Sequence, residues 1–322
     1  MRDTERMGSA LTTIGLPVAL GIIMFGLGLA LTPRDFARVA KHPKAVIIAL
    51  LCQLLVLPAL CFGLVLVFSL PPVLAVGMLL LAASPGGTTA NLYSHLFRGD
   101  VALNISLTAL NSVIAVVTLP LITNLAIAYF LPGDESLGLQ PAKALEVFAI
   151  VLGPVVLGML VRWWKPAFAD RMDRPVRIAS IVILVVVIAG AIVSNLALLL
   201  ENFGRLAGIT VVFCVLSLTI GYLVPRTLRV DRPQSIASSF EIGIHNATLA
   251  IVIAQTVVGS VEMSLPAAVY GVLMFFIALG FGFLIRGRRA TAGDAAQGGS
   301  VTDAAGRPGL ATDAAEVTPP ER

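Results

Sequence analysis

The amino-acid sequence predicts an all-α polytopic membrane protein, and its composition and hydropathy are the observations that predict it. Of its residues, 57% are hydrophobic and 12% are charged, whereas soluble domains are on average about 45–50% apolar and about 25% charged. The mean hydropathy is +0.95. Long apolar stretches recur along the chain, and each approaches the roughly 20 helical residues that a bilayer core requires.

These stretches give about nine predicted transmembrane helices. They are residues 12–31, 45–68, 72–91, 101–131, 141–163, 177–196, 204–225, 233–258 and 264–286. The fourth is long enough for Pro120 to kink it, because proline removes one helical hydrogen bond and its ring displaces the preceding turn.

Basic residues mark alternate loops, as the positive-inside rule requires of cytoplasmic loops. With the N-terminus outside, the inside loops hold Arg34, Arg38, Lys41, Lys44, Arg98, Arg162, Lys165, Arg171, Arg174, Arg177, Arg226, Arg229, Arg232, Arg286, Arg288 and Arg289. We therefore expect a protein of the cell membrane whose C-terminus is cytoplasmic. The net charge of +4 then reflects topology, so no nucleic-acid partner is expected.

The two ends of the chain differ from its middle. Met1–Thr12 is polar and no small-residue cleavage site follows closely on the first apolar stretch, so that stretch is predicted to be a retained helix rather than a signal peptide. From Ala290 onward large apolar residues are nearly absent, and such a segment cannot bury a core. Residues 1–289 are predicted to form the transmembrane domain, and residues 290–322 a disordered cytoplasmic tail.

The third stretch is interrupted by Ser84–Asn91, which contains the residues least suited to a helix interior. Pro85 lacks an N–H, and the two glycines after it let the backbone leave helical angles. Backbone groups freed at membrane depth are tolerated only beside protein or a water-filled cavity. A half-helix beginning near Thr88 would favour an anion at its N-terminus. A kink that only supports packing is the alternative.

The eighth stretch carries Glu241, the one acid deep in any predicted span. A carboxylate there is costly, and membrane proteins that keep one usually bind an ion or move a proton with it. In the fourth stretch Asn104, Thr108 and Asn111 follow at intervals of four and three, so they share one helix face. Amide and hydroxyl oxygens together with a carboxylate suit sodium. Interhelical hydrogen bonding is the alternative, and we prefer it for Asn111 taken alone.

Two further polar residues have open interpretations. Gln53 is interpreted as bonding a neighbouring carbonyl. His245 is either a hydrogen-bonded interior histidine or a titratable group. Three cysteines, Cys52, Cys61 and Cys214, fall within the spans, where free cysteine behaves as a small hydrophobe. No disulfide framework or cysteine metal site is predicted.

The chain resembles the bile acid:sodium symporter family, as a bacterial member of a nine-span type. The likeness rests on five segments in order, Ile22–Leu29, Leu31–Phe36, Pro85–Asn91, Arg98–Leu103 and Glu241–Asn246. The resemblance implies two inverted repeats that form a core domain with two crossed broken helices, and a smaller panel domain. It assigns the broken helices to the third and eighth stretches.

The resemblance also implies two sodium sites behind the helix crossing. The first would comprise the Ala90 carbonyl, Asn91, Asn104, Thr108 and Glu241. The second would comprise Gln53, Glu241, His245 and the carbonyls of Ile242 and Ile244. Ala90 and Asn104 stand where the family often has serines, and His245 replaces a glutamine, although imidazole is a poor ligand for sodium. Thr88, Thr89 and Asn246 are predicted to bind the substrate.

We therefore predict a secondary active transporter that imports a small or amphipathic organic anion with sodium by alternating access. By resemblance the cargo is bile-acid-like, pantoate or a 2-oxo acid. A proton-coupled or sodium-independent carrier on the same fold is the alternative, prompted by His245. A membrane enzyme is not expected, because the loop acids are scattered and His95 has no evident nucleophile partner. A ligand-sensing membrane domain is not expected either, because it would normally connect to a folded cytoplasmic module, whereas this tail is predicted to be disordered. No catalytic residue or organic cofactor is predicted.

Overall fold

The computed structural model describes residues 16–32, 37, 41–132 and 141–286. Regular structure in these ranges is helical, and Gly86 and His245 form one isolated antiparallel β-bridge. The described residues belong to one compact unit. The predicted tail 290–322 and the predicted start of the first helix at residue 12 lie outside the described residues.

Five helical segments are long and apolar enough to cross a membrane, and they coincide with the second, fourth, sixth, seventh and ninth predicted spans. The second span combines α4 (Pro43–Leu51), the π-helix η2 (Cys52–Val56) and α5 (Leu57–Val67). The others are α8 (Val101–Phe130), α10 (Pro166–Ser194), α11 (Leu196–Thr227), and η4 (Glu262–Ser264) continued by α14 (Leu265–Ile285). The structure therefore supports a multi-pass membrane protein.

The remaining four predicted spans correspond to shorter or interrupted helices. They are α2 (Leu16–Ala30), α6 (Pro72–Ala83) with α7 (Thr88–Leu96), α9 (Pro141–Trp164), and α12 (Arg232–Gly243) with α13 (Ala247–Val252) and the π-helix η3 (Ile253–Val258). Three features of the predicted architecture stay predictions. They are the count of nine spans, the inverted repeats, and the division into core and panel domains.

Two of these helices break, and the breaks pair with each other. After α6 the backbone turns extended at Ser84, with φ −72° and ψ 140°, where Pro85 cannot donate a helical hydrogen bond. The chain between α12 and α13 leaves helical angles at Ile244, with φ −115° and ψ 88°. The Asn246 N–H donates to the Pro85 carbonyl at 2.9 Å, and its side-chain oxygen caps α13 by accepting from the Leu249 N–H. Each break thus satisfies backbone groups freed by the other.

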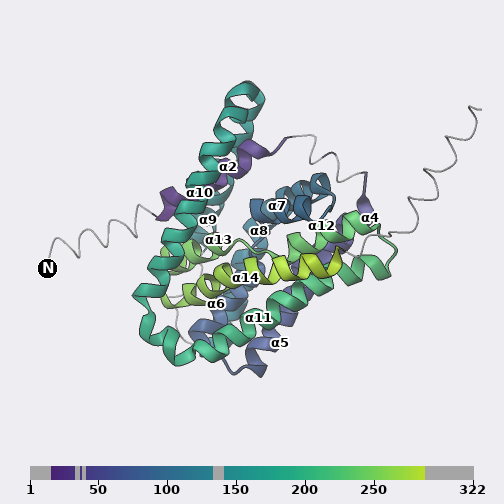
Figure 1. Ribbon diagram of the computed structural model, residues 1–322. Helices are drawn as coiled ribbons and strands as arrows, with labels where there is room; N and C mark the ends of the chain where they lie inside the picture. Colours follow the sequence, from purple (N-terminus) through teal and green to yellow (C-terminus); the bar gives the residue numbers. More distant parts are fainter. Residues whose placement is uncertain (1–15, 33–36, 38–40, 133–140, 287–322) are drawn as a thin grey trace, which may run out of the picture. The chain divides into compact units, whose positions relative to one another are not determined.

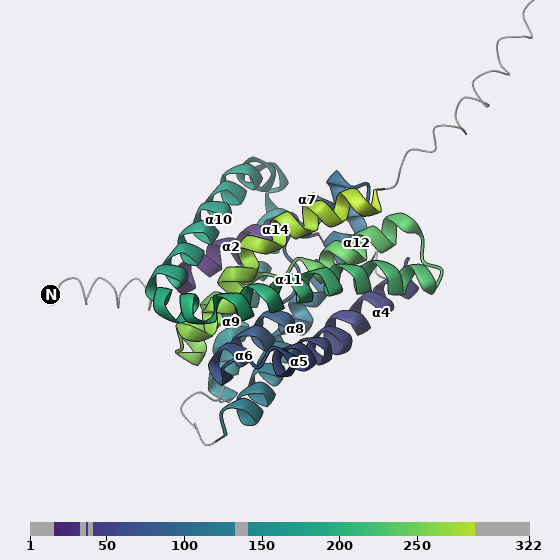
Figure 2. The same ribbon diagram turned by 60° about the horizontal axis from the view of Figure 1, so that its bottom comes forward.

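Helix α2 packs closely on α9 and also against α10 (Figure 1). A Cβ on Gly28 would lie 2.1 Å from the Val155 carbonyl oxygen, and one on Gly158 would lie 2.4 Å from that of Phe25. Only glycine allows two helix backbones to approach so closely in a membrane. Elsewhere α11 runs along α12 and α14, as the turned view shows (Figure 2).

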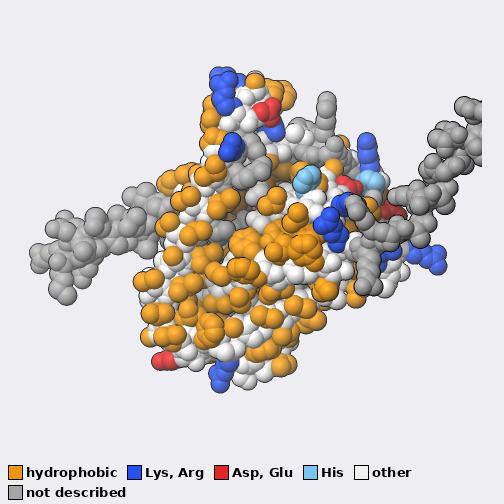
Figure 3. Space-filling model, viewed as in Figure 1, with side chains coloured by type: hydrophobic (Ala, Val, Ile, Leu, Met, Phe, Trp, Pro, Cys, Tyr) orange, Lys and Arg blue, Asp and Glu red, His pale blue; other side chains and the backbone are white. Residues whose placement is uncertain are grey.

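Four of the five segments predicted to carry the inside basic residues contact one another. Arg232 donates to the Ile285 carbonyl at 2.6 Å, the Asp100 N–H donates to the Pro233 carbonyl at 2.9 Å, and Gln234 contacts His42. Arg205 instead bonds the Ser69 carbonyl, between two loops predicted for the opposite side. Hydrophobic side chains cover much of the visible face, and Lys and Arg gather toward its margins (Figure 3). These loop–loop contacts join segments predicted for the same side of the membrane. The alternation of all the loops and the end that faces the cytoplasm stay predictions.

Candidate functional site

Glu241, on α12, lies fully buried against the first helix break. Thr108 Oγ1 donates to its Oε2 at 2.5 Å, and Asn111 Nδ2 donates to its Oε1 at 3.1 Å. The backbone N–H of Gly86 is a third donor. A Cβ on Gly86 would lie 2.6 Å from the Glu241 carboxyl carbon, so glycine is required for this approach.

The hydrogen-bond partners of Glu241 are all neutral. Within the part of the chain that the structure describes, no lysine or arginine pairs with it. A buried carboxylate that lacks a countercharge is costly, even when hydrogen bonds offset part of that cost. An ionised carboxylate accepts at about four positions, and three donors leave room for a further ligand. The arrangement suits a cation that the protein itself does not supply.

Asn104 joins three helices next to this acid. Its Nδ2 donates to Ser94 Oγ at 2.6 Å and to the Ala237 carbonyl at 3.0 Å, and lies 3.4 Å from the Ala90 carbonyl. Its Oδ1 lies 3.5 Å from Thr108 Oγ1. The structure therefore brings four predicted residues of the first sodium set together, in two contacting pairs. They are Ala90 with Asn104, and Thr108 with Glu241.

Asn91, the fifth predicted member of that set, lies on the same helix as Ala90. Its Oδ1 is buried and accepts no hydrogen bond from any described residue. No hydrogen bond joins it to Glu241 or Thr108 among the contacts described here. It also borders the cavity described below.

Two residues of the predicted second sodium set, Gln53 and His245, meet at one carbonyl. Gln53, in the π-helix η2, donates from Nε2 to the Ser84 carbonyl at 3.2 Å, which agrees with its interpretation as a carbonyl partner. His245 Nδ1 lies 3.1 Å from the same oxygen, and since a carbonyl only accepts, Nδ1 carries a proton. Gln53 Oε1 and His245 Nε2 have no partner among the described residues. Ile242 and Ile244 are buried beside them, at the end of α12.

Aromatic side chains hold the His245 ring. Phe213 stacks on it with centroids 5.4 Å apart and planes at 12°, and Tyr270 meets it edge-on at 5.4 Å. The Tyr270 hydroxyl donates to the Gly243 carbonyl at 2.9 Å. The imidazole is thus fixed by two rings and one hydrogen bond, and the end of α12 is tied to α14.

A cavity of about 420 Å³ lies beside both breaks. Residues of α2, α7, α8, α10 and α13 line it, together with Met274 of α14. The predicted substrate residues Thr88, Thr89 and Asn246 all border it. Its volume falls within the range of about 300–1,000 Å³ that small-molecule pockets have.

Asn111 donates to Glu241 of the neighbouring helix α12, which agrees with its interpretation as an interhelical hydrogen-bonding residue. Sequence reasoning missed His95 and Ser180 as residues of the cavity. His95 lines the cavity seven residues after Thr88, a spacing that puts both on one helix face. The lining residue Ser180 of α10 stands in no sequence pattern that predicts it.

Comparison with known proteins places this chain in a family. The model of the sodium bile acid symporter family matches residues 17–202. The sodium-dependent transporter YocS of Bacillus subtilis, described as uncharacterized, is 28% identical over 80% of this chain and 78% of its own. The probable sodium/metabolite cotransporter BASS1 of Arabidopsis thaliana is 30% identical over 79% of this chain and 62% of its own. The human P3 protein is 32% identical over 67% of this chain and 45% of its own. The chain thus spans less than two thirds of these last two relatives.

Proposed function

The chain belongs to the sodium bile acid symporter family, which makes it a membrane transporter and not an enzyme, and we propose that it imports an organic anion together with sodium. The observation that carries the proposal is the fully buried carboxylate of Glu241, whose described partners are neutral donors. A cation that binds beside Glu241 supplies the positive charge that the described residues do not provide. The names of the relatives YocS and BASS1 support sodium as that cation.

In this proposal the first sodium ion binds at Glu241 and Thr108, with Asn91, Asn104 and the Ala90 carbonyl completing its shell. Asn111 orients the carboxylate through its hydrogen bond to Oε1. Hard cations prefer such oxygen ligands. Asn104 would offer its Oδ1, which lies 3.5 Å from Thr108 Oγ1, while its Nδ2 keeps the bonds to Ser94 and the Ala237 carbonyl. No organic cofactor takes part.

The anion binds in the adjacent cavity, beside the start of α7. Thr88 and Thr89 open that helix, and the first N–H groups of a helix lack helical partners and attract negative charge. Asn246 reaches the same cavity from the second break. The described residues that line it include no lysine or arginine, so the bound sodium would balance part of the charge. Each ligand then raises the affinity of the other, which is the basis of coupling.

Alternating access follows if the two sides of the cavity move relative to each other. We assign α2, α9 and α10 to the panel domain, because they pack on one another. The two broken helices and α8 belong to the core domain. We further propose the cell membrane as location, an outside N-terminus, a cytoplasmic C-terminus and a cytoplasmic tail at residues 290–322. The cargo is a bile-acid-like anion, pantoate or a 2-oxo acid.

The experiment that tests the proposal is uptake into proteoliposomes. Purified protein is reconstituted in potassium buffer, and uptake of radiolabelled taurocholate, pantoate and 2-oxoisovalerate is followed after an inward sodium gradient is imposed. We expect at least one anion to accumulate only with the gradient, and Glu241→Gln to abolish that accumulation. Accumulation that Glu241→Gln leaves unchanged would contradict the assigned mechanism.

A second candidate, a proton-coupled or sodium-independent carrier, is favoured by the geometry of His245. Its Nδ1 bonds the Ser84 carbonyl and its Nε2 has no described partner, so the second set offers an imidazole where sodium prefers oxygen. Uptake driven by a pH gradient in sodium-free buffer would establish this candidate. Uptake that needs sodium at every pH would exclude it.

A further inference from the structure

The cavity runs along one face of α7, from the first break to the far end of that helix. The α7 residues that line it are Thr88, Thr89, Asn91, Leu92 and His95, which recur at helical spacing on one side. Thr88 and His95 are separated by about 10 Å along the axis, since a helix rises about 1.5 Å per residue. A molecule in the cavity can therefore contact both ends of this face.

The two ends of the face are polar, and the part between them carries both Asn91 and the apolar Leu92. Near the break, hydroxyl and amide groups of Thr88, Thr89 and Asn246 border the cavity. Farther along α7, Leu92 faces it together with Ile105 of α8 and Leu27 of α2. Such a surface suits a ligand with an aliphatic middle. His95 is the polar side chain of this face at the end opposite the break.

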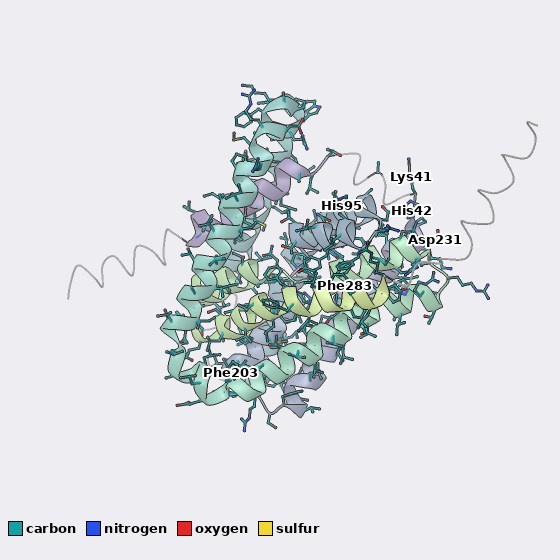
Figure 4. The ribbon with its side chains drawn as sticks, viewed as in Figure 1. Lys41, His42, His95, Phe203, Asp231 and Phe283 are labelled. Carbon is teal, nitrogen blue, oxygen red and sulfur yellow. The ribbon has the colours of Figure 1, made fainter. Side chains whose placement is uncertain are left out.

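The side chain of His95 is free to bind a ligand. It is exposed, and none of the hydrogen bonds described for this structure includes its ring nitrogens. The cavity lining that the structure describes contains no aspartate, glutamate, lysine or arginine, and its other histidine, His245, is already bonded to the Ser84 carbonyl. His95 lies toward the end of the molecule where Lys41, His42 and Asp231 lie (Figure 4).

We propose that His95 determines cargo specificity by hydrogen bonding a second polar group of the anion. The cargo then has an anionic head at Thr88 and Thr89, an aliphatic middle, and a hydroxyl group about 10 Å from the head, as the rise of α7 sets. This inference rests on the proposed function, because that function places the anionic head at the break. A neutral imidazole has one donor and one acceptor nitrogen, so it can donate a hydrogen bond to a hydroxyl or accept one from it.

The test compares two ligands that differ by one hydroxyl. Octanoate has the carboxylate head and the aliphatic chain. 8-Hydroxyoctanoate adds a hydroxyl about 10 Å from the carboxylate, because an extended chain gains roughly 1.2 Å per bond. The full-length protein in lipid nanodiscs is titrated with each by isothermal titration calorimetry at saturating sodium chloride. 4-Hydroxyoctanoate, whose hydroxyl would lie beside Asn91 and short of His95, is the ligand control, and its affinity should not change in His95→Phe.

We expect 8-hydroxyoctanoate to bind about two- to tenfold more tightly than octanoate, which is the gain of one net hydrogen bond. His95→Phe should abolish that preference and leave octanoate affinity within about twofold. His95→Gln, which keeps a donor and an acceptor, should retain part of it. The matched control is His42→Phe, because His42 bonds Gln234 outside the cavity and its loss should leave the preference intact.

Equal affinity of the wild-type protein for the two ligands would overturn the inference. So would a preference that survives in His95→Phe. In both cases octanoate binding that requires sodium would leave the proposed function standing. Failure of octanoate and both hydroxyoctanoates to bind, with sodium present, would overturn the inference for His95, whereas the uptake experiment with taurocholate, pantoate and 2-oxoisovalerate decides the proposed function separately.

Discussion

The replacement of Glu241 by glutamine tests the site most directly, because it removes the charge and keeps the shape. Thr108 can still hydrogen bond the amide, since a hydroxyl donates and accepts. The negative charge that would hold sodium in a buried site is lost. Removing one partner of a buried charge pair costs about 3–5 kcal/mol. That range corresponds to a loss of sodium affinity of about 10²- to 10³-fold or more.

The loss is measurable as a difference in stability. Sodium at one hundred times its Kd stabilises the folded protein by about 2.7 kcal/mol. If Glu241→Gln weakens the site a hundredfold, the same concentration only equals the new Kd, and the stabilisation falls to about 0.4 kcal/mol. We therefore expect the variant to lose more than about three quarters of the sodium effect, by the same relation.

The assay is thermal unfolding of the purified protein in sodium chloride and in potassium chloride at equal ionic strength. The stability difference between the two salts removes any change that the substitution makes to intrinsic stability. Glu262→Gln is the matched control, because Glu262 is exposed at the start of η4, just before α14, and this variant should retain the whole effect. A sodium-specific stabilisation that persists undiminished in Glu241→Gln would refute the reasoning.

Three further predictions concern the residues around this acid. Gly86→Ala places a methyl group 2.6 Å from the carboxylate and should abolish sodium stabilisation in the same assay, whereas Gly87→Ala, with open space at that position, should retain it. Equal behaviour of the two variants would contradict the geometry. Tyr270→Phe removes the hydroxyl donor to the buried Gly243 carbonyl and leaves it only the weak donor of the Cys214 thiol. This substitution should cost about 1 kcal/mol in potassium chloride. The control Tyr129→Phe, at an exposed position, should cost less than about 0.5 kcal/mol. His245→Gln supplies an amide oxygen beside Gln53, so we expect stability to depend more steeply on sodium concentration, and an unchanged dependence would count against a second site there.

Hydropathy predicts where the helices lie because a lipid-facing helix needs apolar side chains along its whole length. Five predicted spans accordingly recur as long apolar helices. The break after Ala83 was predictable for a local reason, since Pro85 and two glycines disfavour a helix wherever they occur. The break at Ile244 has no proline, and only the resemblance to a family indicated it.

The partners of Glu241 could be predicted only in part. Asn104, Thr108 and Asn111 share a helix face, so that any of them can reach an acid on a neighbouring helix. In the structure Thr108 and Asn111 contact the carboxylate, while Asn104 bonds Ser94 and the Ala237 carbonyl. The depth at which α8 crosses α12 decides which of these side chains reach the carboxylate, and no local sequence pattern encodes that depth.

The sequence by itself determined the class of protein, the positions of most helices, the first break and the singular acid, because each depends on local composition or on the cost of a charge in lipid. The tertiary structure decided which polar groups meet. It joined Gln53 and His245 at the Ser84 carbonyl and brought Gly86 against Glu241. It also set residues of α2, α8 and α10 opposite the α7 face that carries Thr88 and His95. These contacts arise between residues far apart in the chain, where helix packing rather than local sequence sets the distance.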